Sequence, residues 1–117
     1  YFEDQKAEAI RAARAFRTAR LPKWLEYFDL TLTHAGAPWL FGDEPSYVDL
    51  GLAHTLDGLA YAFPHAFGRS IEPYSALLAL RDRAWALPKL AAYRASDRHV
   101  AFNEHGLFRC YPELDPR

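Results

Sequence analysis

The sequence predicts an all-α protein, a helical bundle of four to five helices formed as one domain by residues 1–117. Apolar residues recur every three or four positions in several segments, which places them on one face of a helix. No segment alternates apolar and polar residues for long enough to indicate a strand. Glycine and proline separate the helical segments at short intervals, as expected for a bundle with short connections.

The composition is typical of a globular domain, with 50% hydrophobic and 25% charged residues. The formal net charge of −1 argues against nucleic acid as a partner, since phosphate binding needs a basic surface. No apolar run approaches the roughly 20 residues that span a bilayer, so we expect no membrane segment. The single cysteine, Cys110, allows no intrachain disulfide and fits a reducing, cytoplasmic setting.

Two helices are expected in the first third of the chain. Residues 3–20 contain no glycine or proline and are rich in strong helix formers. Pro22 is expected to break or kink this segment and to begin the second helix. That helix ends near His34, where Gly36 gives a stop signal.

A loop over residues 35–45 carries three apolar residues, Trp39, Leu40 and Phe41. We expect all three to pack into the core, because single apolar anchors in loops are common. The alternative is that they contact a partner.

Ser46 and Asp49 have the spacing of a capping box, in which each side chain accepts a hydrogen bond from the backbone N–H of the other. Pro45 and Leu50 occupy the positions of the accompanying hydrophobic staple. The helix that follows is small or apolar on most of its faces, so we expect it to be the central helix, ended by Pro64.

The remaining chain is predicted to hold less helix. Residues 64–73 are expected to form a connection, residues 74–86 a helix, and residues 89–96 a short helix restarted by Leu87 and Pro88. The segment from Arg98 onward is expected to form a tail with about one helical turn. Four apolar side chains anchor this tail in the prediction: Phe102, Leu107, Phe108 and Tyr111.

The residues alone name no reaction. There is no glycine-rich phosphate loop, dinucleotide fingerprint or nucleophile elbow. No two histidines lie three or four positions apart on a predicted helix, so we expect no metal site. Asp57 is spaced to orient His54 on the central helix, but no nucleophile is near them, and we assign no catalytic residue.

Four segments, in this order, resemble the C-terminal domain of cytosolic glutathione transferases. Arg20–Leu25 looks like the start of the second helix of that domain. The pattern Gly42-x-x-x-Ser46-x-x-Asp49 matches the capping-box motif of its central core helix. Leu87–Ser96 resembles a later helical segment of the family, and residues 102–115 resemble the tails of some members.

The resemblance implies part of a cytoplasmic, homodimeric detoxification enzyme that conjugates glutathione to a small apolar electrophile. In that family a thioredoxin-like N-terminal domain binds glutathione and activates its thiol, and this chain contains no segment that matches it. We therefore expect the chain to be inactive alone and to use no cofactor, with glutathione a substrate of the full-length protein. We also expect the chain to begin partway into the first helix of the C-terminal domain, and to expose apolar surface that the missing domain would cover.

The resemblance also suggests where the electrophile binds. Tyr1 and Phe2 are the first candidates for the co-substrate pocket, and Phe102 and Phe108 are the second pair, because family tails often fold over the pocket mouth. The other interpretation is that all four side chains simply pack. Two further readings of the whole chain stay open: a non-catalytic protein–protein docking module of the same fold, and an unrelated bundle that binds a partner helix.

Overall fold

The computed structural model describes residues 1–117 and confirms the all-α fold. Its α-helices are listed here with their bounds: α1 (Lys6–Ala15), α2 (Leu21–Ala35), α3 (Tyr47–Ala62), α4 (Pro64–Ile71), α5 (Ser75–Trp85) and α6 (Pro88–Arg94). Short 3-10 turns at Glu3–Gln5 and Pro112–Leu114 lie near the two ends. A π-helical turn joins α1 to α2, so the helices form five separate rods, as the sequence predicts.

Pro22 lies at the start of the second helix, as expected, but it does not break the helical segment before it. The backbone stays helical from α1 to α2, and Pro22 lies in the first turn of α2. Proline lacks an N–H and its ring clashes with the carbonyl four residues earlier, which normally disrupts a helix. Here the turn before it, Phe16–Arg20, widens to π geometry, in which the Leu21 N–H bonds the carbonyl of Phe16. This wider turn lets the helix pass Pro22 without a loop.

The predicted end of α2 is correct. Gly36 adopts a left-handed conformation with φ 60° directly after Ala35, and its N–H bonds the carbonyl of Thr33. Glycine carries no Cβ, so this conformation costs it little. The chain then turns away into the loop before α3.

Two of the three apolar residues in this loop are core residues. Trp39 and Leu40 are buried, as expected, whereas the side chain of Phe41 is 74% exposed. The expectation for Phe41 is therefore wrong. An antiparallel bridge between Trp39 and Gly42 closes a tight turn, with φ 127° at the glycine, and Phe41 lies on the outside of it.

The carboxylate of Asp49 joins this loop to the start of α3. The capping box with Ser46 is present. The N–H and the hydroxyl of Ser46 donate to Oδ2 at 2.8 and 2.7 Å, and the N–H of Leu40 donates to Oδ1 at 2.8 Å. Burial alone would raise the pKa of Asp49, but these donors outweigh it and bring the pKa below its ordinary value of 3.8.

Residues 64–73 are not the connection that the sequence suggests, because most of them form α4. Pro64 ends α3 and also begins α4, at a position where a missing N–H is harmless. The next two N–H groups, of His65 and Ala66, donate to the carboxylate of Asp115 at 2.7 and 3.1 Å. The acceptor that caps α4 thus comes from the far end of the chain, which no local pattern reveals.

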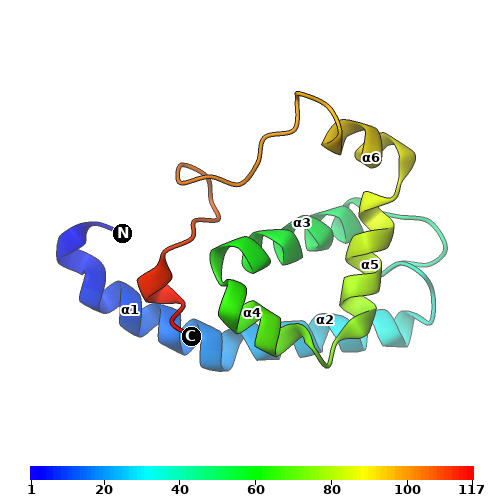
Figure 1. The fold of residues 1–117 in the computed structure, drawn as a ribbon. Coiled ribbons are helices and arrows are strands. Elements are labelled where there is room, and N and C mark those ends of the chain that lie inside the picture. The colour runs from blue at the N-terminus through cyan, green and yellow to red at the C-terminus, as the bar shows by residue number, and fades with distance from the viewer.

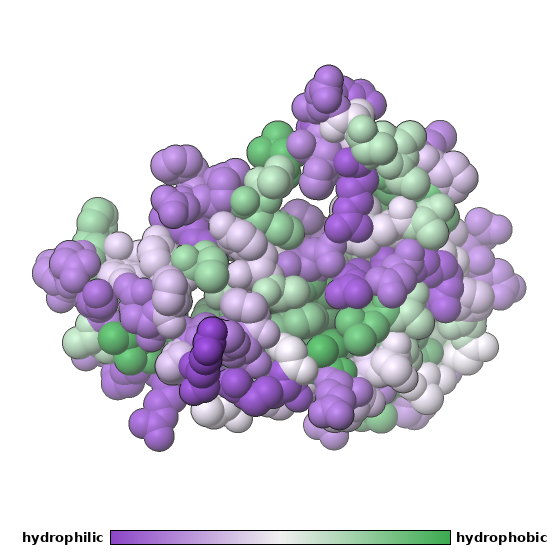
Figure 2. Space-filling model, in the orientation of Figure 1, coloured by the Kyte–Doolittle hydropathy of each residue, from purple (hydrophilic) through white to green (hydrophobic).

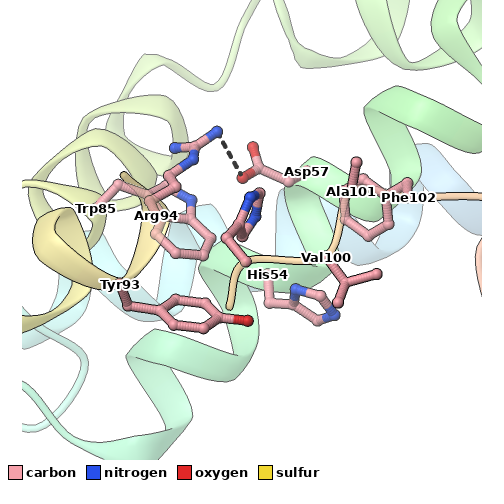
Figure 3. Close-up of a pocket in the computed structure, with 9 residues that line it drawn as sticks. His54, Asp57, Trp85, Tyr93, Arg94, Val100, Ala101 and Phe102 are labelled. Carbon is pink, nitrogen blue, oxygen red and sulfur yellow. Dashed lines mark ion pairs between the residues drawn. The ribbon is translucent and has the colours of Figure 1, made fainter. Parts of the chain in front are cut away.

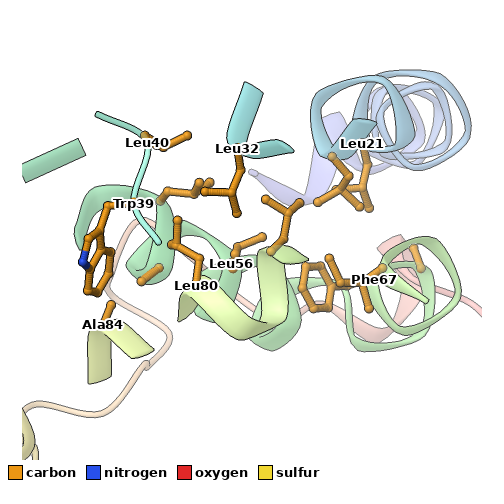
Figure 4. Packing of buried hydrophobic residues seen from close by; sticks show 14 residues of the cluster. Leu21, Leu32, Trp39, Leu40, Leu56, Phe67, Leu80 and Ala84 are labelled. Carbon is orange, nitrogen blue, oxygen red and sulfur yellow. The ribbon is translucent and has the colours of Figure 1, made fainter. Parts of the chain in front are cut away.

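The helices surround one apolar core (Figures 1 and 4). The rod of α1 and α2 runs along one edge of the molecule, and α4 and α5 stand between α2 and the central helix α3. Each of α2, α3, α4 and α5 contributes buried side chains, including Leu21, Leu56, Phe67 and Leu80. Helix α3 packs against both α4 and α5, which supports its predicted central position.

The tail returns across the bundle from α6 to the side of α1 (Figure 1). Phe102, Phe108 and Tyr111 are partly buried, as expected of anchors. Leu107 is 91% exposed, so its expected anchoring role is wrong. None of the helices is sufficiently long and apolar to cross a membrane.

Replacing Asp49 with asparagine should destabilise the fold. The amide offers one acceptor oxygen in place of two, so a buried donor of Ser46 or Leu40 loses its partner. We expect the free energy of unfolding at pH 7 to fall by about 2–3 kcal/mol. Urea denaturation followed by circular dichroism measures this. The control, Asp43→Asn, changes an exposed carboxylate of the same loop and should have an effect of less than about 0.5 kcal/mol.

The stability that the Asp49 carboxylate contributes should depend on pH. The folded-state pKa of Asp49 is depressed, so its stabilisation is complete above its ordinary pKa and is lost as the pH falls through the folded value. The stability difference between the wild type and Asp49→Asn should therefore shrink below about pH 4. A difference that stays constant down to pH 2.5 would contradict this assignment.

Replacing Asp115 with alanine should loosen the start of α4. The N–H groups of His65 and Ala66 lose their acceptor, which costs about 1–2 kcal/mol for a helix cap. Amide hydrogen exchange of these two groups should accelerate. Glu104→Ala, at an exposed position of the same tail, is the control and should leave both exchange rates unchanged.

Candidate functional site

An aromatic cluster forms where the tail crosses α3. The ring of Phe102 stacks on Tyr61, with centroids 5.3 Å apart, and lies 5.5 Å from the ring of His54. The ring of Phe108 lies 5.7 Å from Phe102 and 5.8 Å from His54. His54 and Tyr61 are seven positions apart on α3 and so share one face of that helix. The tail side chains therefore cover this face.

Gly58 makes the close approach of Phe108 possible. A Cβ built on Gly58 would lie 2.4 Å from ring atoms of Phe108, which no real contact allows. The ring occupies the space that any other residue would fill with its side chain. This packs the tail directly on the backbone of α3.

Beside this cluster lies a pocket of about 340 Å³ (Figure 3). Helix α3 contributes His54 and Asp57 to its wall, and the tail contributes the segment His99–Phe102. The end of α5 contributes Trp85, and α6 contributes Tyr93 and Arg94. Its volume is at the lower end of the range of small-molecule pockets.

The polar side of the pocket is an ion-pair cluster. The carboxylate of Asp57, 17% exposed, lies 3.7 Å from Arg81 and 3.8 Å from Arg94. Arg94 also covers the ring of Trp85, with its guanidinium carbon 4.5 Å from the ring centroid. Asp57 thus pairs with arginines, and it accepts no hydrogen bond that would orient His54. The arrangement offers charged and aromatic side chains to a ligand, and it contains no activated nucleophile.

The four side chains suggested for the co-substrate pocket lie at two separate places. Phe102 lines the pocket described above, and Phe108 supports Phe102 from behind. Tyr1 packs on Tyr111 with ring centroids 5.0 Å apart, and Phe2 is 75% exposed. Neither Tyr1 nor Phe2 is part of the pocket wall.

Tyr1 also interacts with the tail. Its hydroxyl donates a hydrogen bond to the carboxylate of Glu113, and this bond is the main reason that the pKa of Tyr1 rises to about 12. The same bond, with Lys6 nearby, lowers the pKa of Glu113. This contact ties the start of the chain to the tail.

A second hollow, of about 380 Å³, opens between α2 and α3. We call it the apolar groove. All but one of its lining residues are hydrophobic: Phe16, Leu21, Trp24, Leu25, Phe28, Leu52, Thr55, Leu56, Leu59 and Leu77. Trp24, which lines the groove, and Tyr27, on the same helix, are about half exposed. On the face that Figure 2 shows, apolar side chains gather over the middle of the bundle among hydrophilic ones.

Sequence reasoning did not find the polar side of the pocket. From the sequence, Asp57 is expected only to orient His54, and neither Trp85 nor Arg94 is indicated as a site residue. Their positions in helices carry no signal, since they meet only when α3, α5 and α6 come together. No group of three or more histidine, cysteine or carboxylate side chains is close enough to bind a metal ion.

The comparison with protein families agrees with this architecture. Residues 1–97 match the family described as glutathione S-transferase, C-terminal domain. The chain therefore belongs to the glutathione S-transferase C-terminal domain family. A search of curated proteins found no match to it.

Gly58→Ala should displace the ring of Phe108 and destabilise the fold by about 1–3 kcal/mol, the usual cost of overpacking. Urea denaturation measures this. Gly51→Ala is a matched control on the same helix, because a Cβ at Gly51 meets nothing within 4 Å. That control should be neutral or stabilising by up to about 1 kcal/mol, since alanine is the better helix former. Equal effects of the two changes would contradict the packing of Phe108 on α3.

Proposed function

We propose that this chain is the C-terminal domain of a cytoplasmic glutathione transferase that conjugates glutathione to an apolar electrophile. In this proposal the domain contributes a wall of the co-substrate pocket and contacts in a homodimer. The glutathione site and the residue that activates the thiol belong to a thioredoxin-like domain elsewhere in the full-length protein. The domain by itself is inactive.

The observation that carries the proposal is the pocket beside the tail, in a chain of this family. Phe102 presents an aromatic wall to it, backed by Tyr61 and Phe108. Aromatic side chains bind apolar molecules over a large area. The absence of a nucleophile among the lining residues fits a domain that binds the electrophile while another domain activates glutathione.

The apolar groove supports the proposed role of this domain in subunit contacts. Exposed apolar patches that are rimmed by polar residues mark contact sites. The groove and the neighbouring side chains of Trp24 and Tyr27 offer such a surface along α2. We infer that this surface meets a second subunit or the glutathione-binding domain.

The same groove favours one competing function. A non-catalytic docking module of this fold would also present an apolar surface to another protein. The two functions differ in one property, since only the transferase binds glutathione. The single free cysteine, Cys110, is compatible with a cytoplasmic location in either case.

The full-length protein should bind glutathione with a dissociation constant between about 1 μM and 1 mM in a calorimetric titration, and it should conjugate an aryl halide activated by nitro groups. In that reaction the thiolate sulfur bonds the aryl carbon and the halide leaves. Phe102→Ala should raise the KM for the aryl halide about tenfold and leave glutathione affinity unchanged, because it removes apolar contact with the electrophile alone.

Leu107→Ala is the matched control, because this leucine is an exposed apolar residue of the same tail. This substitution should change neither the KM for the aryl halide nor the affinity for glutathione. A folded dimer that does not bind glutathione would exclude the transferase and leave the docking module as the function.

A further inference from the structure

One side chain of the pocket has hydrogen-bonding capacity that the fold does not use. The guanidinium group of Arg94 makes no hydrogen bond, and its only ion-pair partner, Asp57, lies at 3.8 Å. The Arg94 side chain is 47% exposed and lines the pocket. Its guanidinium group therefore presents donors to whatever enters. Arginine is suited to bind a carboxylate through two parallel hydrogen bonds.

The charges around Arg94 leave it available to an anion. Asp57 also faces Arg81, whose closer partner is Asp82 at 2.9 Å. The positive charges of the two arginines thus balance the negative charges of Asp57 and Asp82. A bound carboxylate would share Arg94 with Asp57, and Arg81 would still neutralise Asp57.

The indole ring of Trp85 also favours a ligand that carries a hydrogen-bond acceptor. Nε1 of Trp85 is a buried donor without a hydrogen-bond partner, on a side chain that lines the pocket. A buried donor without an acceptor is energetically unfavourable. The guanidinium group of Arg94 lies over this ring, so an anion held by Arg94 would also lie near the indole (Figure 3).

The rest of the pocket wall is suited to an aromatic ring. Tyr93, Trp85 and Phe102 supply three aromatic side chains around the hollow (Figure 3). A cation is disfavoured, because Arg94 already occupies the face of Trp85 and two guanidinium groups face the only carboxylate of the wall. A wholly apolar molecule would contact the aromatic side of the pocket but would make no use of the donors of Arg94 and Trp85.

We propose that this pocket binds an aromatic carboxylic acid, with the carboxylate at Arg94 beside Trp85 and the ring against Phe102 and Tyr93. The inference rests on the proposed co-substrate pocket and adds a carboxylate to the aromatic, apolar part of its ligand. It does not require that the protein bind glutathione. The two claims therefore fail independently.

The test titrates 2-naphthoate into the ¹⁵N-labelled full-length protein and follows the tryptophan indole N–H resonances by NMR. Trp85→Phe assigns the resonance of Trp85. This resonance should shift saturably, whereas the neutral isostere 2-naphthamide should bind at least tenfold more weakly. Arg94→Gln should weaken naphthoate binding at least tenfold. Arg14→Gln removes the same charge at an exposed position outside the pocket and should have no effect.

Equal affinity for the acid and the amide would overturn the proposal, as would an unchanged affinity in Arg94→Gln. Shifts confined to the Trp24 resonance would place the ligand in the apolar groove and would also overturn it. Glutathione is titrated into the same sample. Naphthoate binding at Trp85 without glutathione binding would support the aromatic-acid site and exclude the transferase.

Discussion

The position of α3 depends on one buried carboxylate. Asp49 is fully buried and accepts hydrogen bonds from Ser46 and from the Leu40 N–H. A buried carboxylate is costly unless donors surround it, so the loop and the helix start can meet in few other ways. The contact places Trp39 and Leu40 in the core and sets the direction in which α3 leaves the loop. Helices α4 and α5 then pack against α3, and the tail crosses the face of α3 that carries His54 and Tyr61.

The tail adds one wall to the pocket that the helices border. It is attached to α4 through Asp115 and to α3 through the ring of Phe108 over Gly58. Between α6 and these attachments, the segment His99–Phe102 forms one wall of the pocket. The same interaction that caps α4 therefore also helps to retain the wall.

Family membership alone does not determine what the chain binds, since one fold serves many functions. The pocket adds chemical detail, because its aromatic wall and the unused donors of Arg94 lie side by side. The apolar groove, by contrast, has no charged lining residue and is better suited to a protein surface. The two hollows therefore differ in chemistry, since one combines charged and aromatic side chains and the other is almost entirely apolar.

The sequence by itself determined the features that depend on near neighbours. The capping box of Ser46 and Asp49 and the helix end at Gly36 follow from contacts within about four residues, and local patterns report such contacts. The tertiary structure decided the rest. Helix α4 is capped from fifty positions away by Asp115, and Arg94 meets Asp57 only after the helices pack. Separations of this size leave no periodic signal in the sequence, so only the folded chain brings these groups together.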